Sequence, residues 1–273
     1  MKVDLHSHTL VSDGHLSPKE LVARAIENDV DILSITDHDS TGAYVELGDL
    51  NAYSIKLIPG IELSTQWRGI GVHIVGLNID LDNEVIQAGV KRQAVSRAER
   101  AELIAKRLIK LGLSVDLVRV KAIAGGVNIG RPHFAQHLVE IGAVKDFAMA
   151  FKKYLGNGKA GDVKQCWAAL PDIVGWITAS GGTAVLAHPL KYKMTRTKLS
   201  ALLDEFSAVG GQAMEVVSGV QTNDVTGQMG ALCKEKNLLA SCGSDFHQPS
   251  QWSEIGRMSA LPKQCEPVWA TWL

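Results

Sequence analysis

Short apolar or alternating runs that end in a polar residue recur along the chain, and each of them predicts a β-strand. The runs cover residues 3–8, 32–38, 57–64, 72–79, 183–188, 213–218 and 238–245. Between several of these runs, the apolar residues have the spacing of a helix. Ser17, Pro18 and Glu20 have the order of a capping box with a proline at the first helical position, and LVARAIEN follows at helical spacing, so a helix joins the first two strands.

The pattern changes between residues 82 and 165. A long helix rich in Arg and Lys is predicted over about 82–112, and shorter helical stretches follow with little strand signal. A helix is predicted at 170–180, ended by Gly181 and Gly182, and after it the alternation of strands and helices resumes. The alternation favours a barrel-like α/β fold whose active site lies at the C-terminal ends of the strands. We therefore expect a catalytic barrel from residues 1–81 and 166–273, and a helical insertion over 82–165.

Composition and charge narrow the possible functions. The formal charge of −1 and the pI of 6.8 exclude a generally basic surface that coats nucleic acid, so nucleotide binding would need a local cluster. No run approaches the roughly 20 apolar residues of a membrane span, and the polar, histidine-rich start does not resemble a secretory leader. We expect a cytoplasmic protein without membrane contact. The four cysteines form no CxxC pair and are interpreted as reduced packing residues.

Almost every predicted strand ends in, or carries, a residue that can bind a metal ion. These residues are His6, His8, Asp13, His38, Glu62, His73, His188, Asp245 and His247. Because side chains two apart in a strand point the same way, His6 and His8 can face one centre. So many nitrogen and oxygen ligands exceed the needs of one ion and indicate two or three divalent ions, with Mn²⁺, Fe²⁺ and Zn²⁺ all compatible. His15 lies in a loop and is expected to be solvated.

The motifs that contain these residues resemble those of the polymerase and histidinol phosphatase (PHP) superfamily. They are HSHTLVSDG (6–14), ITDHDST (35–41), IPGIE (58–62), VHIVGLN (72–78), LAHP (186–189) and GSDFH (243–247). They span the chain in the order of the superfamily. The flanking words SDGHLSP, TDHDSTGA, FKKYLGNGKAG and GSDFHQP are similar to the bacterial 3′,5′-nucleoside bisphosphate phosphatases, a branch also associated with 5′→3′ exonuclease action on short RNA.

The resemblance implies a distorted seven-stranded (β/α) barrel, a trinuclear site and a small helical insertion that forms a lid over its mouth. It implies Mn²⁺ as the expected ion, with Fe²⁺ or Zn²⁺ as alternatives. By motif position, His6, His8, Glu62 and Asp245 hold one ion, Glu62, His73 and His188 a second, and Asp13, His38 and His247 a third. Glu62, Asp245 and His247 are the implied catalytic residues.

Clustered divalent ions neutralise a phosphoester and lower the pKa of bound water, so the expected nucleophile is a metal-bridging hydroxide. The expected reaction is hydrolysis of the 3′-phosphate of a nucleoside 3′,5′-bisphosphate. One alternative is 5′→3′ exoribonuclease action on short 5′-phosphorylated RNA at the same site. A second is a non-catalytic metal-binding module, which the intact set of candidate ligands disfavours. The expected partner is a small nucleotide, with short RNA as a further possibility, and no obligate protein partner is inferred.

A substrate with two phosphates needs cationic anchors away from the metal ions. Arg131 stands at a predicted helix start, where free backbone N–H groups also favour phosphate, and His133 and Lys191 are candidate helpers. Each could instead be an ordinary surface residue. The basic helix, which includes Arg97 and Arg100, is interpreted as a solvated face with RNA contact as the alternative. Asp37 and Asp39 are expected either to orient imidazoles or to cap a turn.

Overall fold

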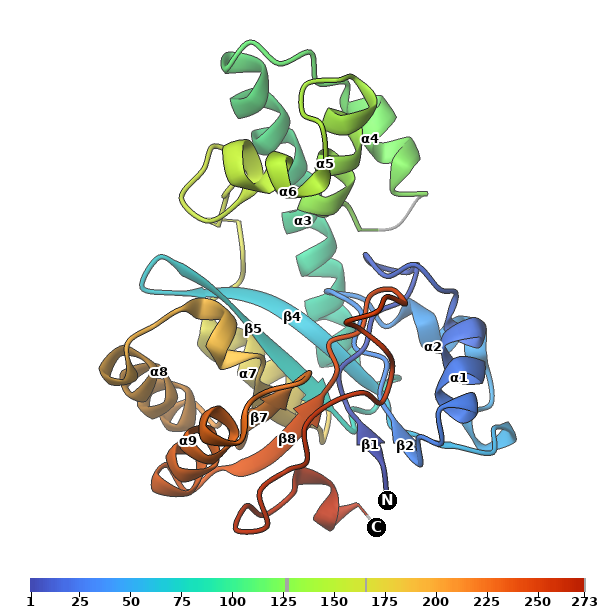
Figure 1. The fold of residues 1–273 in the computed structure, drawn as a ribbon, viewed down its shortest axis with the longest axis vertical. Coiled ribbons are helices and arrows are strands. Elements are labelled where there is room, and N and C mark those ends of the chain that lie inside the picture. Colours follow the sequence, from blue (N-terminus) through green and yellow to red (C-terminus); the bar gives the residue numbers. More distant parts are fainter. Residues whose placement is uncertain (126–127, 165, 273) are drawn as a thin grey trace.

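The computed structural model describes residues 1–125, 128–164 and 166–272, and in these ranges the strands form two sheets (Figure 1). The first sheet has the order β1-β2-β3 and is parallel, with β1 (Val3–Asp4), β2 (Ile32–Leu33) and β3 (Lys56–Leu57). The second has the order β4-β5-β6-β7-β8. Its strands are β4 (Gly60–Trp67), β5 (Ile70–Leu77), β6 (Thr183–Leu186), β7 (Ala213–Ser218) and β8 (Leu239–Gly243).

Every predicted run overlaps an observed strand, but the run at 57–64 divides into β3 and β4. The strand β4 then continues to Trp67 and returns as β5 through a two-residue turn. Arg68 and Gly69 in that turn have φ values of 47° and 77°, as a tight hairpin requires. As a result β5 is antiparallel to both β4 and β6, whereas β6, β7 and β8 are parallel.

The closed seven-stranded barrel expected from the resemblance is not shown, because the ladders form separate sheets of three and five strands. No ladder joins the two sheets among the described residues, but isolated parallel bridges link Ser7 with Phe246 and His38 with Glu62, and the Leu5 N–H donates to the Cys242 carbonyl at 3.1 Å. Within the first sheet, side-chain hydrogen bonds continue the pairing beyond β1 and β2: the Ser7 N–H donates to Thr36 Oγ1 at 3.2 Å, and Ser7 Oγ donates to the Ser34 carbonyl at 2.8 Å. The fold is therefore mixed α/β, with β1 and β2 cut short beside the site.

Helices cover the outer faces of both sheets (Figure 1). The expected capping box at α1 (Pro18–Glu27) is confirmed, since Ser17 and Glu20 exchange hydrogen bonds. Beside the three-stranded sheet α1 packs with α2 (Gly42–Leu47), and beside the five-stranded sheet lie α7 (Leu170–Ala179), α8 (Arg196–Ala208) and α9 (Asn223–Glu235). Short turns of helix are η1 (Leu50–Ala52), η3 (Pro189–Tyr192) and η4 (Val268–Thr271).

Between β5 and α7, the described residues form mainly helices joined by loops, and residues 84–164 are called the helical segment here. It contains α3 (Glu84–Lys110), α4 (Leu117–Ile123), α5 (Arg131–Glu140), α6 (Phe147–Ala150) and one π-helical turn, η2 (Phe151–Leu155). Phe134, Leu108 and Leu138 belong to a hydrophobic cluster of this segment, while Ile86 at the start of α3 belongs to the core of the five-stranded sheet. Figure 1 shows α3 rising from the sheets into the helical segment. The predicted boundary residue, 165, lies outside the described residues.

Among the described residues, no helix combines the length and the apolar character needed to cross a membrane.

Candidate metal centre

The Glu62 carboxylate lies at the centre of the site. Glu62 is the third residue of β4 and its side chain is fully buried. Its Oε1 is 2.9 Å from His73 Nδ1 and 2.8 Å from His188 Nε2. Its Oε2 is 2.8 Å from His38 Nδ1 and 3.4 Å from the Nε2 atoms of both His6 and His8. Five imidazoles therefore surround one carboxylate.

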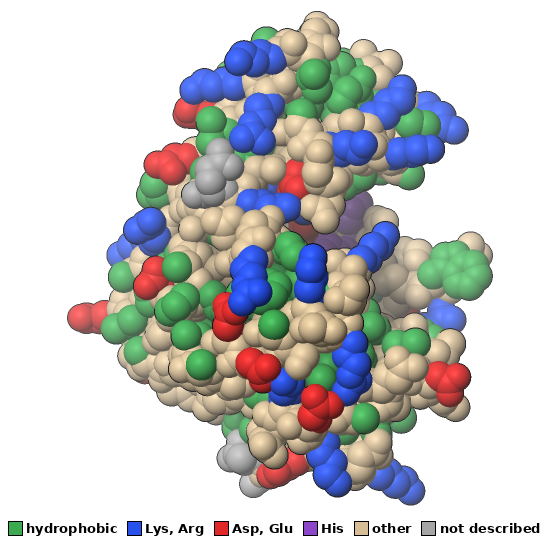
Figure 2. Space-filling model, turned by 90° about the vertical axis from the view of Figure 1, so that its left-hand side faces the viewer, with side chains coloured by type: hydrophobic (Ala, Val, Ile, Leu, Met, Phe, Trp, Pro, Cys, Tyr) green, Lys and Arg blue, Asp and Glu red, His purple; other side chains and the backbone are tan. Residues whose placement is uncertain are grey.

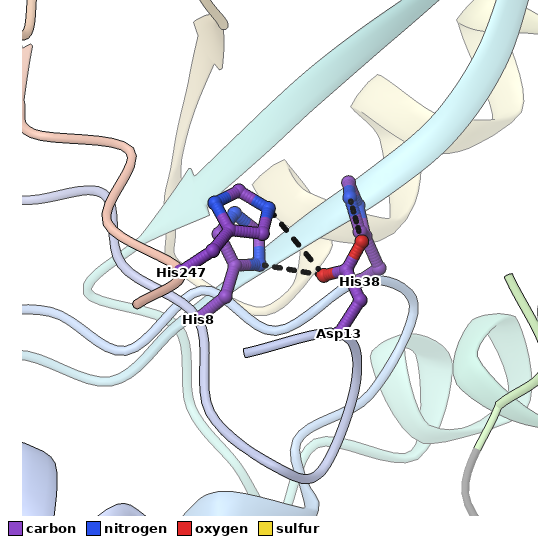
Figure 3. Close-up of side chains that lie close together, drawn as sticks. All are labelled: His8, Asp13, His38 and His247. Carbon is purple, nitrogen blue, oxygen red and sulfur yellow. Dashed lines mark ion pairs between the residues drawn. The ribbon is translucent and has the colours of Figure 1, made fainter. Parts of the chain in front are cut away.

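A second group gathers around Asp13, as Figure 3 shows. Asp13 Oδ1 is 3.8 Å from His8 Nδ1 and 3.5 Å from His247 Nε2, and its Oδ2 is 3.7 Å from His38 Nε2. The His247 ring donates from Nδ1 to the Asp245 carbonyl at 2.9 Å, which leaves Nε2 to face Asp13. His8 and His38 thus face both carboxylates, that of Asp13 and that of Glu62.

Asp245 completes the set. Its Oδ1 is 3.3 Å from His8 Nε2 and 3.6 Å from His6 Nε2, and its Oδ2 contacts Lys191 Nζ. The backbone of Asp245 has a φ of 52° and that of His188 a φ of 27°, values that side-chain-bearing residues rarely adopt. Such strained backbone positions persist only where the surrounding structure holds them, and they are frequent at functional sites.

The unpaired atoms of the cluster fit metal ions. Buried atoms without a hydrogen-bond partner in the described residues include His6 Nε2, both ring nitrogens of His8, His188 Nδ1 and Glu62 Oε2. An unpaired buried polar atom costs about 1–3 kcal/mol, and an ion is one explanation for a group of them. The donors are imidazole nitrogens and carboxylate oxygens without thiolate, a set that suits Mn²⁺, Fe²⁺ or Zn²⁺.

The candidate ligand atoms form four overlapping groups, and within each group the atoms lie within 4.8 Å of one another. They are His8, Asp13, His38 and His247; His6, Glu62 and His188; His6, His8 and Asp245; and His38, Glu62 and His73. The structure thus brings together all nine sequence-predicted ligand residues. Two contacts add to the sets implied by the resemblance: His8 also lies near Asp13, and His38 also lies near Glu62.

The electrostatics keep most ligands in the form that binds a metal, which is a charged carboxylate and a neutral imidazole. Burial acts to raise the pKa of Glu62, but His38, His73 and His6 hold it well below its usual range. Burial lowers the pKa of His73 to about 4, and it lowers that of His8 well below the ordinary value. His6 and His38 differ. Burial lowers both pKa values, but the carboxylates of Glu215 and Glu62 raise that of His6 to about 10, and those of Glu62 and Asp13 raise that of His38 above its ordinary value.

Two aspartates flank His38 and hold neighbouring segments. Asp37 accepts hydrogen bonds from Thr9 N–H at 2.8 Å, Thr9 Oγ1 at 2.6 Å and Ser12 Oγ at 2.6 Å, and so fixes the loop that carries Asp13. Asp39 accepts from the Ser64 N–H at 2.7 Å and from Gln93 Nε2 and Arg97. In the described part of the chain these bonds go to a loop, to β4 and to α3, and none goes to an imidazole, so the interpretation that the two aspartates orient imidazoles is not supported.

The interpretation of Arg97 and Arg100 as members of a solvated face is wrong. Both are only 6% exposed, because this face of α3 turns toward the site. Arg97 forms a buried ion pair with Asp39 Oδ2 at 2.6 Å, and Arg100 donates from Nε to the Val163 carbonyl at 2.7 Å. Their guanidinium groups lie 5.4 Å and 5.1 Å from the ring centroid of Trp167. The sequence does contain a signal for this, since two arginines three residues apart lie on the same face of a helix.

Sequence reasoning also missed Glu215, which accepts a hydrogen bond from His6 Nδ1 at 2.8 Å. The available signal was a carboxylate inside the apolar strand β7, AMEVVS.

His15 is exposed, as expected.

A cavity of about 310 Å³ lies between the cluster and the helical segment. Its lining includes Asp13, His38, Glu62, His188, Asp245 and His247 on one side, and Arg97, Arg100, Arg131, Lys164, Trp167 and Lys191 elsewhere. Figure 2 shows histidines inside a cleft that opens to solvent below the helical segment. Anion-binding groups thus lie beside the cluster.

The three predicted substrate anchors differ in position. Arg131 lines the cavity, is 31% exposed, and donates from Nη1 to the Leu155 carbonyl at 3.2 Å. Lys191 also lines the cavity. His133 is outside the lining set among the described residues: its Nδ1 accepts from the Gly130 N–H at 2.9 Å and caps the start of α5.

Residues 4–125 match the model of the family described as PHP domain. The chain is 43% identical over 98% of its length to a 5′-3′ exoribonuclease Rnm of Escherichia coli, of which it covers 93%. It is 40% identical over 98% of its length to a 3′,5′-nucleoside bisphosphate phosphatase of Chromobacterium violaceum, of which it covers 95%. A solved amidohydrolase from Chromobacterium violaceum is similar over 99% of this chain and 95% of its own, with 39% identity and a TM-score of 0.88.

We expect the purified protein, stripped with a chelator and titrated with Mn²⁺, to take up about two to three equivalents per chain. The reason is that the candidate ligand atoms exceed the coordination of one ion. Isothermal titration and elemental analysis measure the stoichiometry. Uptake of less than one equivalent would contradict a polynuclear centre.

Proposed function

The chain belongs to the PHP-domain family, and on that premise we propose that it is a metal-dependent phosphoesterase that hydrolyses the 3′-phosphate of nucleoside 3′,5′-bisphosphates. The observation that carries the proposal is the pairing of two features in one cavity. One is the carboxylate-centred histidine cluster, and the other is the set of cationic side chains that faces it. A nucleoside bisphosphate needs groups that neutralise the charge of the phosphate that reacts, and a separate cationic anchor for its second phosphate.

We propose that the nine cluster residues hold two to three divalent ions, with Mn²⁺ expected and Fe²⁺ or Zn²⁺ as alternatives. The overlap of the ligand groups supports this, since Glu62, His6, His8 and His38 each belong to more than one. Bound ions of this kind neutralise phosphate charge and bring the pKa of water toward neutrality. Glu62 would determine the spacing of the ions because each of its oxygens faces different imidazoles.

Asp245 and His247 are proposed catalytic residues because both belong to the cluster and line the cavity. Lys191, which lines the same cavity and whose ammonium group contacts Asp245, is the proposed helper in binding substrate phosphate. Arg131 and the almost buried Arg100 would hold the second phosphate. A 3′,5′-bisphosphate carries two similar monoesters, so an anchor at a fixed distance from the cluster selects which one reacts.

A second candidate function is 5′→3′ exoribonuclease action. The similarity to the Escherichia coli exoribonuclease and the open cleft in Figure 2 favour it. A panel that measures phosphate and nucleotide release from 3′,5′-bisphosphates, 5′-monophosphates, histidinol phosphate and short 5′-phosphorylated RNA separates the candidates. Failure to hydrolyse any of these substrates after Mn²⁺ loading would reject both.

Two finer features belong to the same proposal. The bridges of Ser7 with Phe246 and of His38 with Glu62 support a barrel-like closure of the two sheets around the site. A division into residues 1–81 with 166–273 and a lid of 82–165 is supported by the separate hydrophobic cluster of the helical segment. A cytoplasmic location stays a prediction.

Glu62→Gln should lower kcat by several orders of magnitude, because an amide cannot supply the charge that balances ions on both of its sides. Steady-state kinetics on adenosine 3′,5′-bisphosphate with Mn²⁺ measures the loss, and circular dichroism checks the fold. The control is Glu205→Gln, which changes a carboxylate paired with Arg68 on the surface. A Glu62 variant within tenfold of the parent would make this residue peripheral to the reaction.

Arg131→Ala should reduce kcat/KM for adenosine 3′,5′-bisphosphate at least roughly tenfold, because a charge-assisted contact to phosphate contributes about 1.5–3 kcal/mol. An aryl phosphate has no second phosphate, so its kcat/KM should change little. Arg119→Ala, which removes an exposed arginine of the same helical segment, is the matched control. Equal losses on both substrates would assign Arg131 to the fold or to the cluster.

A further inference from the structure

Glu215 supports two candidate ligands from a strand that carries none of the nine. It lies in the middle of β7 and is 2% exposed. Its Oε1 accepts a hydrogen bond from His6 Nδ1 at 2.8 Å, and its Oε2 accepts one from the backbone N–H of His188. The position of β7 explains both contacts, since its neighbour β6 leads to His188 and its other neighbour β8 contacts β1, which leads to His6.

The contact with His6 determines which nitrogen keeps its proton when the ring is neutral, the form that binds a metal. A carboxylate can only accept, so Nδ1 stays the donor and Nε2 is the nitrogen that offers a lone pair. That Nε2 has no hydrogen-bond partner in the described residues and faces Glu62 Oε2 at 3.4 Å and Asp245 Oδ1 at 3.6 Å. A carboxylate that orients a ligating imidazole in this way is a recurrent support for metal sites.

The contact with His188 stabilises a strained backbone. The φ of His188 is 27°, and the acceptor on its N–H comes from Glu215. Space around Glu215 is also tight, because a Cβ at Gly243 would lie 2.3 Å from His6 Cβ and 3.0 Å from Glu215 Oε1. The carboxylate and the ring are thus confined between β7 and β8.

We propose that Glu215 is a positioning residue that sets the metal affinity of the cluster by fixing the tautomer of His6 and the backbone of His188. The inference rests on the proposed metal-dependent function. Glu215 touches two ligand residues from neighbouring parts of the sheet, so it links their positions. It acts through those residues and is not itself among the grouped candidate ligands.

Glu215→Gln tests the proposal. An amide offers one acceptor and one donor group to two N–H donors, so either the His188 contact is lost or the His6 ring must reverse its tautomer. Loss of such a supporting group typically weakens metal binding about 10–100-fold. We expect this weakening for one equivalent of Mn²⁺ in isothermal titration of the chelator-stripped protein. The ¹⁵N signals of the labelled histidines, recorded without metal, should report a changed His6 environment.

Glu205→Gln is the matched control and should bind Mn²⁺ as the parent does. Glu215→Asp keeps both acceptors on a shorter side chain and should show a smaller loss, which also serves if the glutamine variant does not fold. Parent-like Mn²⁺ binding by folded Glu215→Gln overturns the proposal. A lower melting temperature without a change in Mn²⁺ affinity overturns it as well, since this indicates a purely structural role. Failure of the parent itself to bind Mn²⁺ would instead reject the metal-dependent function.

Discussion

The Glu62 carboxylate is fully buried among five imidazoles, and burial of a charge is costly unless other groups compensate it. Histidines supply that compensation from segments distant in sequence, at the ends of β1 and β2, on β5 and after β6. The surrounding structure can be understood as the means of keeping these segments together. Isolated bridges join the two sheets at this place, and Asp37 and Asp39 fix the loops on either side of His38.

Polar contacts around the cluster also connect it to the helical segment. Asp39 pairs with Arg97 in the buried part of α3, and Asn128 Nδ2 donates to the Asp39 carbonyl at 3.2 Å. A buried ion pair is weak evidence for stability, but removal of one partner leaves an uncompensated charge. The structural role of this ion pair is to fix the position of α3 relative to Asp39, the residue that follows His38. The arginines of the cavity therefore stand in a defined relation to the cluster.

Local patterns predicted much of this arrangement. The capping box predicted the start of α1. Polar residues at the ends of apolar runs, together with Asp13 in a loop, His73 within a strand and the resemblance of their motifs, predicted all nine members of the cluster. The β4–β5 hairpin escaped prediction because Arg68 and Gly69 look like an ordinary loop until their φ values are known. Glu215 and Arg100 escaped because their roles depend on partners far away in sequence. His133 was misplaced because the direction of a side chain at a helix start depends on the cap it makes.

The course of α3 has a consequence for substitutions along its length. One continuous helix carries Ile86 in the core of the sheets, Arg97 and Arg100 beside the cavity, and Leu108 in the upper cluster. Its lower half lies beside the candidate metal centre, whereas its upper half packs against α4 and shares a hydrophobic cluster with α5 and α6. A substitution confined to the upper half of α3 would therefore change the packing of the helical segment and leave the contacts of Arg97 and Arg100 in place.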